Sequence, residues 1–195
     1  VSLCKIMVKN KIRKSLLEQG QLLSKKNISK INSVVQNSVI NNINLSSSKN
    51  NLLYFPYRNE IKTNQIIAEL KKYSNNIYMP KILSDVEMKF NLFSSTDLLK
   101  ENKYGIKEVI NDKFLNSSHF DTMFVPLVGV DKNGSRLGYG GGYFDRAMSE
   151  MIKEKNKPLV VGMCYDYQVI DQEFGESHDM KYDVIFTETR ILSFS

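Results

Sequence analysis

The chain has 195 residues, of which 42% are apolar, and this supports a single domain with a real core over residues 1–195. No apolar run approaches the ~18–20 residues of a membrane span. The first residues, VSLCKIMVKNKIRK, lack the continuous apolar stretch of a signal peptide. These features argue against a membrane protein, and we expect a soluble, cytoplasmic one.

The net charge of +6 is unevenly distributed along the chain. Residues 1–31 contain eight basic side chains and one acid, Glu18, so the remainder is close to neutral. A basic segment of this kind can bind a polyanion, such as nucleic acid, an anionic membrane or a phosphorylated small molecule. It can equally be the solvated face of a helix. Cys4 and Cys164 show no disulfide or metal-site spacing, and we expect free thiols in a reducing compartment.

Apolar periodicity and turn residues predict helices and strands that alternate along the chain. Such alternation favours an α/β fold, with a mostly parallel central sheet flanked by helices in an open sandwich and a basic helix at the N-terminus. The expected elements are helices over 3–19, 28–43 (with Ser29 as a possible cap), 63–73 (capped by Thr63) and 145–155, and strands over 52–57, 76–80, 88–93, 121–131, 158–166 and 182–189.

Residues 136–146, RLGYGGGYFDR, carry four of the ten glycines of the chain, between a predicted strand and a predicted helix. Glycines let the backbone approach a ligand closely, and successive N–H groups can form a nest for an anion at the start of a helix. Arg136 and Arg146 add donors suited to phosphate, and Asp145 adds a hard oxygen ligand for Mg²⁺. Together these features suit a nucleoside triphosphate.

Other phosphate-binding motifs fit this stretch poorly. A P-loop needs Lys followed by Ser or Thr after its glycines, and none follows here. A dinucleotide fingerprint needs GxGxxG, but Tyr143 occupies the place of the third glycine. A tight glycine turn without a ligand is the remaining alternative.

The longer stretch VPLVGVDKNGSRLGYGGGYFDR, residues 125–146, resembles the signature of the 5-formyltetrahydrofolate cyclo-ligase family, also called methenyltetrahydrofolate synthetases. Further segments resemble family landmarks in the same order, so that the resemblance covers nearly the whole chain. They are KNKIR (9–13), YFPYRNEIKT (54–63), GIKE (105–108), PLVVGMCYDYQVID (158–171) and HDMKYDVIFTE (178–188).

The resemblance implies that the protein converts ATP and 5-formyltetrahydrofolate to ADP, phosphate and 5,10-methenyltetrahydrofolate, with Mg²⁺ as cofactor. The formyl group is a poor electrophile, so its oxygen must first accept the γ-phosphoryl group, and N10 then attacks the activated carbon. No covalent enzyme intermediate is needed, because the protein has only to align the reactants and stabilise charge. The implied partners are reduced folate and ATP. We expect a monomer with no nucleic-acid or membrane partner.

The resemblance also implies roles for individual residues. Lys9 and Arg13, spaced i, i+4 on one helix face, would contact ATP phosphates. Arg136, Tyr143 and Arg146 would be catalytic. The ATP loop would comprise Arg136, Leu137, Gly138, Tyr139, Gly140, Gly141, Gly142, Tyr143 and Phe144, and the folate would contact Phe55, Glu60, Tyr139, Gly140, Gly141, Gly142 and Tyr143.

By the same resemblance, Asp145 and Asp179 would bind the metal. Asp145 could instead cap the following helix, and Asp179 could be an exposed loop acid. His178 is expected to be a loop residue rather than a general base. Met88 and Phe93 would either line the pterin pocket or belong to the core.

Three positions depart from the family pattern. Phe144 replaces a second tyrosine, GIKEV replaces GIPEP, and Leu127 stands where glycine is common.

Two other functions remain open at this point. One is a nucleic-acid binder that uses the basic N-terminus, although the sequence has no motif for it. The other is a folate- or nucleotide-binding protein without turnover.

Overall fold

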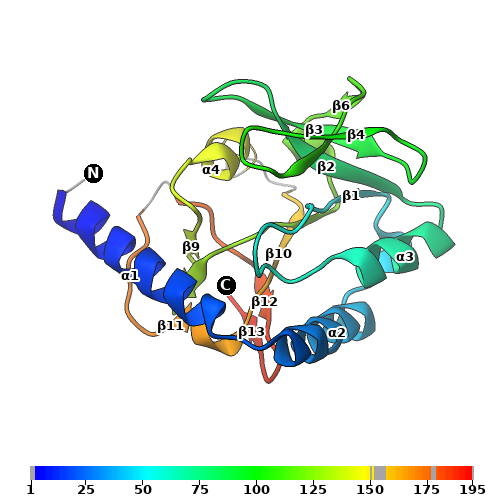
Figure 1. Ribbon diagram of the computed structural model, residues 1–195. Helices are drawn as coiled ribbons and strands as arrows, with labels where there is room; N and C mark the ends of the chain where they lie inside the picture. The colour runs from blue at the N-terminus through cyan, green and yellow to red at the C-terminus, as the bar shows by residue number, and fades with distance from the viewer. Residues whose placement is uncertain (1–2, 150, 152–156, 177–178, 195) are drawn as a thin grey trace.

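The structure is a computed structural model that describes residues 3–149, 151, 157–176 and 179–194. Its main feature is an eight-stranded sheet (Figure 1). The strands, in chain order, are β1 (Asn50–Leu52), β2 (Asn76–Ile82), β3 (Met88–Phe93), β6 (Phe114–Leu115), β7 (Thr122–Phe124), β10 (Leu159–Met163), β12 (Val184–Phe186) and β13 (Ile191–Ser193).

The spatial order of this sheet is β13-β12-β10-β7-β1-β2-β3-β6. The central strands β12, β10, β7, β1 and β2 run parallel to one another, and β13, β3 and β6 pair antiparallel at the two edges. Parallel strands covered on both faces are expected to be apolar throughout. Accordingly, Phe124 packs into the core on one face, whereas its neighbours Met123 and Val125 pack into the core on the other.

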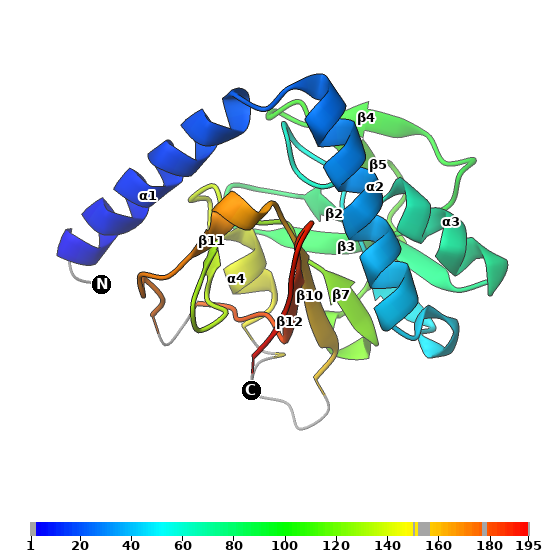
Figure 2. The same ribbon diagram turned by 90° about the horizontal axis from the view of Figure 1, so that it is seen from below.

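Helices cover both faces of the sheet. α2 (Lys25–Asn42) and α3 (Asn64–Lys72) lie on one face, and their residues Val39 and Ile66 are fully buried there (Figure 2). The short helix α4 (Tyr143–Ala147) contributes Phe144 to the opposite core. The predicted α/β class, with a mostly parallel sheet between helices, is therefore confirmed.

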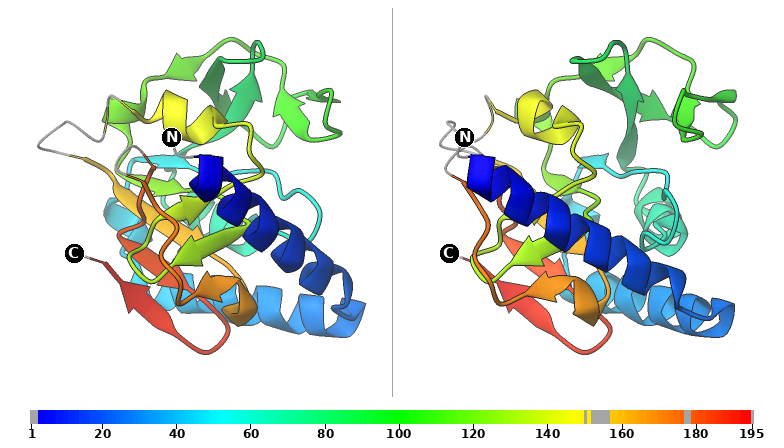
Figure 3. Two further views of the ribbon diagram at one scale, coloured as in Figure 1. Left: turned by 90° about the vertical axis from the view of Figure 1, so that its left-hand side faces the viewer. Right: turned by 60° about the vertical axis from the view of Figure 1, so that its left-hand side comes forward.

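A smaller sheet connects the core to the N-terminal helix. It has the order β11-β8-β9 and is formed by β8 (Gly129–Asp131), β9 (Arg136–Leu137) and β11 (Val169–Ile170). α1 (Leu3–Gln21) lies across it, with Leu16 buried against Val128 and Leu137 (Figure 3). The remaining elements are a hairpin of β4 (Leu99–Glu101) and β5 (Lys107–Val109), and 3-10 turns η1 (Leu45–Ser47), η2 (Ser117–His119) and η4 (Asp166–Gln168).

Several predicted boundaries are wrong, and the reasons are local. The apolar run 121–131 forms two strands, β7 and β8, in different sheets, with Pro126 between them. The strand expected over 52–57 pairs only over Asn50–Leu52, and the residues after it line the cavity described below. Ser29 does not cap α2, because the side chain of Ser24 accepts the hydrogen bond from Asn27 N–H at 3.2 Å.

The helix expected over 145–155 is α4 over Tyr143–Ala147, and much of the remaining range lies outside the described residues. Thr63 occupies the cap position of α3, but its hydroxyl donates to the carbonyl of Tyr54 at 3.0 Å instead of capping.

Within the described ranges, no helix combines the length and apolar character needed to cross a bilayer. Cys164 is a buried free thiol, and burial raises its pKa well above the ordinary value. The side chain of Cys4 lies outside the described part of the chain.

Candidate active site

A cavity of about 740 Å³ opens between α1, the segment 54–60, the segment 136–146 and the β4–β5 hairpin. Its volume falls within the ~300–1,000 Å³ typical of small-molecule sites. All the residues to which the sequence assigned a binding, catalytic or metal role line it: Lys9, Arg13, Phe55, Glu60, Arg136, Leu137, Gly138, Tyr139, Gly140, Gly141, Gly142, Tyr143, Phe144, Asp145, Arg146 and Asp179.

The glycine loop, residues 138–142, connects β9 to α4 and forms one wall of the cavity. Gly140 and Gly142 have positive φ values of 102° and 64°, a conformation that other residues rarely adopt. Gly138 is required for a different reason. A Cβ at this position would lie 2.7 Å from both terminal nitrogens of the Arg136 guanidinium. The loop therefore needs glycine at position 138 to leave room for the Arg136 side chain.

Arg136 is held inside the cavity wall. Its Nε donates to the carbonyl of Pro126 at 2.8 Å, its Nη1 lies 3.5 Å from Asp145 Oδ2, and its guanidinium lies 5.1 Å from the ring centre of Phe144. Arg13 reaches the same wall from α1 and donates from Nε to the carbonyl of Gly138 at 2.7 Å. Burial and the nearby charge of Arg136 lower the pKa of Arg13. Two cations thus lie beside the glycine loop.

Arg146 occupies a different position from Arg136. It is exposed, donates from Nε to the carbonyl of Val86 at 3.0 Å, and donates from Nη2 to the carbonyl of Gly141 at 2.8 Å. Its guanidinium also lies 5.2 Å from the ring centre of Tyr143. In this conformation Arg146 fixes the end of the glycine loop to the connection between β2 and β3.

Asp145 lies in the first turn of α4, whose cap is Gly142. The alternative role of Asp145 as the helix cap is therefore wrong. Its Oδ1 is buried and has no hydrogen-bond partner among the described residues. A buried carboxylate oxygen without a protein donor is expected to bind an ion or a water molecule. A carboxylate oxygen is the ligand type that Mg²⁺ prefers, but no group of three or more acids, histidines or cysteines that could hold a metal occurs among the described residues, so phosphate oxygens would have to supply further ligands.

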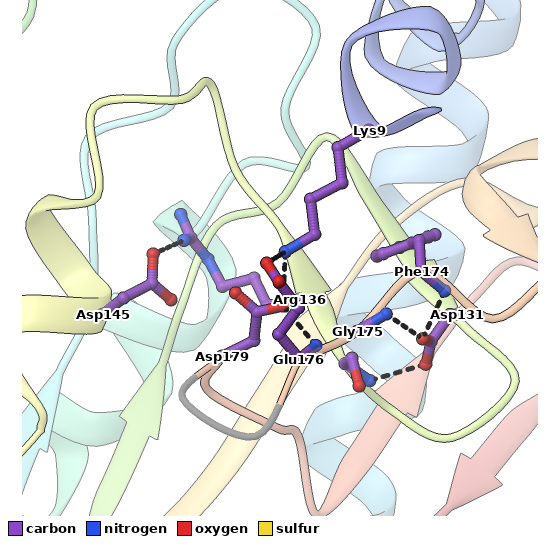
Figure 4. Close-up of polar contacts among 9 residues, drawn as sticks. Lys9, Asp131, Arg136, Asp145, Phe174, Gly175, Glu176 and Asp179 are labelled. Atoms are coloured by element: carbon purple, nitrogen blue, oxygen red, sulfur yellow. Dashed lines mark hydrogen bonds and ion pairs between the residues drawn. The ribbon is translucent and has the colours of Figure 1, made fainter. Parts of the chain in front are cut away.

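Asp179 is paired with a lysine. Its Oδ2 lies 2.6 Å from Lys9 Nζ, which also lies 3.1 Å from Glu176 Oε2 (Figure 4). Only 11% of the Asp179 side chain is exposed, so the alternative role of an exposed loop acid is wrong. Burial opposes the charge of Lys9, but the hydrogen bonds and charges of the two acids outweigh it and raise the pKa of Lys9. His178 lies outside the described residues.

Glu60 lines the cavity from the segment 54–60. It belongs to a tight turn in which Tyr57 N–H donates to Glu60 Oε2 at 2.7 Å. Part of its surface faces the cavity, but protein atoms surround the carboxyl group, and burial raises the pKa of Glu60 to about 8. The Tyr57 N–H and the positive charge of Arg136 oppose this shift.

Aromatic and apolar side chains complete the cavity. Tyr139 packs edge-on against Tyr57, with ring centres 5.3 Å apart. The hydroxyls of Tyr143 and Tyr104 lie 3.2 Å apart, so the β4–β5 hairpin contacts the segment that follows the glycine loop. Met88 lines the cavity and is also buried in the core, whereas Phe93 is partly buried and packs against Phe55 and the core.

The sequence did not single out Tyr104, Glu108 or Glu176. Glu108 is buried in the cavity wall, where its Oε1 accepts from Ile82 N–H at 2.9 Å and from Asn102 Nδ2 at 2.8 Å. Tyr104 precedes the GIKE segment and Glu176 precedes Asp179 by three positions. Glu108 is the last residue of the GIKE segment, and for Tyr104 and Glu176 proximity to these motifs was the only signal that could have identified them.

The profile of the 5-formyltetrahydrofolate cyclo-ligase family matches residues 5–188. The chain belongs to this family. A curated family member from Haemophilus influenzae is 32% identical over 159 residues, which cover 78% of this chain and 83% of that protein. A 5-formyltetrahydrofolate cyclo-ligase from Mus musculus is 25% identical over 189 residues, covering 92% of this chain and 93% of the relative.

Solved structures show the same fold for family members. A 5,10-methenyltetrahydrofolate synthetase from Aquifex aeolicus superposes with a TM-score of 0.81 at 27% identity, covering 95% of this chain and 92% of that one. A 5,10-methenyltetrahydrofolate synthetase from Mycoplasma pneumoniae gives a TM-score of 0.76 at 24% identity, covering 92% and 98% of the two chains, and supports the fold alone. The predicted family, fold and enzyme class, a ligase, are confirmed.

Proposed function

We propose that this family member catalyses the ATP-dependent cyclisation of 5-formyltetrahydrofolate to 5,10-methenyltetrahydrofolate, with release of ADP and phosphate. The observation that carries the proposal is one cavity lined by two unlike sets of residues. The glycine loop with Arg13 and Arg136 provides donors for phosphate, and Glu60 with its apolar surroundings provides a site for a flat heterocycle. A reaction between ATP and a folate needs both sets of residues in one cavity.

The chemistry requires the formyl oxygen to become a leaving group. It attacks the γ-phosphorus of ATP, the bond to ADP breaks, and an iminium phosphate forms on the folate. N10 then attacks the formyl carbon, the C–O bond breaks, phosphate leaves, and the N10 proton is lost. The protein contributes alignment and charge stabilisation, and no covalent enzyme intermediate forms.

Arg136 is assigned to the transferring phosphoryl group. Arg136 Nε donates to the carbonyl of Pro126, and Gly138, which has no Cβ, leaves room for the guanidinium. Both contacts hold the guanidinium in position before any ligand binds. Such a preorganised donor stabilises developing charge without reorganisation. Arg13 and Lys9, which line the same cavity from α1, are assigned to the ATP phosphates. Arg146 keeps the glycine loop in place at its far end.

Glu60 is assigned to the pterin, whose amino and ring N–H groups are donors. An ionised carboxylate accepts from both, so pterin binding favours loss of the Glu60 proton. Tyr143 is assigned to the formyl end, where its hydroxyl can donate to the oxygen that gains charge. Mg²⁺, held by Asp145 and Asp179, would neutralise triphosphate charge.

The test mixes purified protein with 5-formyltetrahydrofolate, ATP and Mg²⁺ and follows the near-ultraviolet absorbance of the methenyl product. We expect a signal that depends on all three components. Arg136→Ala should lower it strongly, whereas Arg190→Ala, an exposed arginine paired with Asp166 outside the cavity, should leave it unchanged. If no ATP-dependent product forms at high protein concentration, the proposed activity is wrong. The protein would then be a folate- or nucleotide-binding protein without turnover.

A further inference from the structure

Lys9 is held between two acids at the edge of the cavity. Its ammonium lies 2.6 Å from Asp179 Oδ2 and 3.1 Å from Glu176 Oε2. The exposed fractions of the three side chains are 14%, 11% and 13%, so water screens these ion pairs only partly. Figure 4 shows the lysine reaching from α1 to the segment that carries both acids.

This arrangement conflicts with the roles proposed for the same residues during catalysis. Lys9 is assigned to ATP phosphates, and Asp179 is assigned to Mg²⁺. Asp179 Oδ2 already accepts from Lys9 Nζ and from Glu176 N–H at 2.8 Å. An ammonium and a divalent cation therefore compete for one carboxylate, since neither cation can be brought beside the other without repulsion.

We propose that the Lys9 ammonium takes the place of the metal in the nucleotide-free chain, and that binding of the metal–nucleotide complex displaces it towards the phosphates. This inference rests on the proposed function, because it links the two ligands of that reaction. Metal without nucleotide binds poorly, since it must displace Lys9 with nothing to receive the ammonium. With ATP present, the phosphates receive it.

Hydrogen bonds hold the backbone that leads to Glu176. Asp131 is buried, and its Oδ2 accepts from Phe174 N–H at 3.2 Å and from Gly175 N–H at 2.9 Å. These two hydrogen bonds attach the segment before Glu176 to Asp131, the last residue of β8. Gly175 packs so closely that a Cβ there would lie 2.1 Å from Ser135 Oγ.

The lysine is the part that can move. Its ammonium sits on a flexible four-carbon stem, whereas Arg13, one turn further along α1, is already bonded to the carbonyl of Gly138 at 2.7 Å. Residues four positions apart share one helix face. A swing of the Lys9 side chain along this face therefore leads towards the glycine loop, without movement of the helix.

The inference is tested by metal binding in the absence of nucleotide. Mn²⁺ serves as the probe, and its affinity is measured by electron paramagnetic resonance and calorimetry. Lys9→Met removes the ammonium from beside two neighbouring acids, which favours a divalent ion in its place, so we expect Mn²⁺ to bind about tenfold more tightly or better. The same substitution should weaken the binding of ADP with Mn²⁺. Lys9→Gln, which keeps a polar side chain, should change both affinities in the same directions.

Lys14→Met is the matched control, because Lys14 lies on the same helix, carries the same charge and is 80% exposed. It should leave both affinities unchanged. Adding Asp179→Asn to Lys9→Met should abolish the gain in Mn²⁺ affinity. Unchanged or weaker Mn²⁺ binding by both Lys9 variants would overturn the inference, and so would unchanged nucleotide affinity. These binding measurements are independent of turnover, so they stand apart from a failure of the cyclisation assay.

Discussion

Replacing Glu60 by glutamine is expected to change how the stability of the protein depends on pH. Burial raises the pKa of this carboxyl from 4.5 to about 8. Between these values the folded chain retains a proton that the unfolded chain has lost. Stability from this group is therefore complete below pH 4.5 and is lost progressively as the pH rises through 8. The Glu60→Gln variant has no such proton.

The size of the effect follows from the pKa difference. One retained proton changes the free energy of unfolding by about 1.4 kcal/mol for each pH unit. From pH 5.5 to 7.5 the wild-type protein should therefore lose up to ~2.7 kcal/mol more than the variant. Water in the cavity weakens the burial, so we expect a difference of about 1–2.5 kcal/mol. Glutamine keeps an oxygen for the N–H of Tyr57, so the turn should remain intact.

Urea unfolding followed by circular dichroism at several pH values measures this difference directly. Groups that titrate in both proteins cancel when the two pH profiles are subtracted. Glu69→Gln is the control, because Glu69 is an acid of α3 whose pKa is lowered by its hydrogen bond to Lys72. Its profile should follow the wild type above pH 5.5. Equal pH slopes for wild type and Glu60→Gln would refute a buried, protonated Glu60.

Three further results are expected from activity measurements. The KM for 5-formyltetrahydrofolate should fall as the pH rises towards 8 in the wild type and stay flat in Glu60→Gln, because pterin binding needs the ionised carboxylate; parallel profiles would remove Glu60 from the pterin site. Arg136→Ala should lower kcat by ~10²–10³-fold. Arg146→Ala loses bonds to backbone carbonyls and the contact with the Tyr143 ring, so it should cost about tenfold or less; equal losses would place both arginines on the phosphoryl group. Gly138→Ala should approach the loss in Arg136→Ala while its thermal unfolding remains cooperative, because the added Cβ would lie 2.7 Å from the guanidinium nitrogens; wild-type kcat would show that this close contact is unimportant.

The part of the site that could be predicted from the sequence is the part that is contiguous in it. Residues 136–146 carry backbone freedom, positive charge and an acid within one short segment, so their chemistry can be interpreted without knowing the fold. Lys9 and Arg13 could be paired because helical spacing places them on one face. Both line the cavity, whereas Lys5, Lys11 and Lys14 on the same helix are exposed.

What could not be predicted depends on contacts between distant segments. Glu176 pairs with Lys9 across 167 positions, and Tyr104 meets Tyr143 across 39. Neither residue stands out by type or spacing. The strand boundaries failed for a related reason. The apolar residues on either side of Pro126 look like one strand, but the chain leaves the large sheet there and enters the small one.

Phe144 illustrates how the structure changes the interpretation of a departure from the family pattern. From the sequence, phenylalanine at this position means only that a hydroxyl is missing. In the structure its ring is buried in the core, 5.1 Å from the guanidinium of Arg136. The position of that guanidinium is set by three contacts: the face of the Phe144 ring, the carbonyl of Pro126 and Gly138, which has no side chain. A phenylalanine serves this purpose as well as a tyrosine, because a cation interacts with the face of either ring. The position therefore supports Arg136 through its ring, and a hydroxyl is not needed for that support.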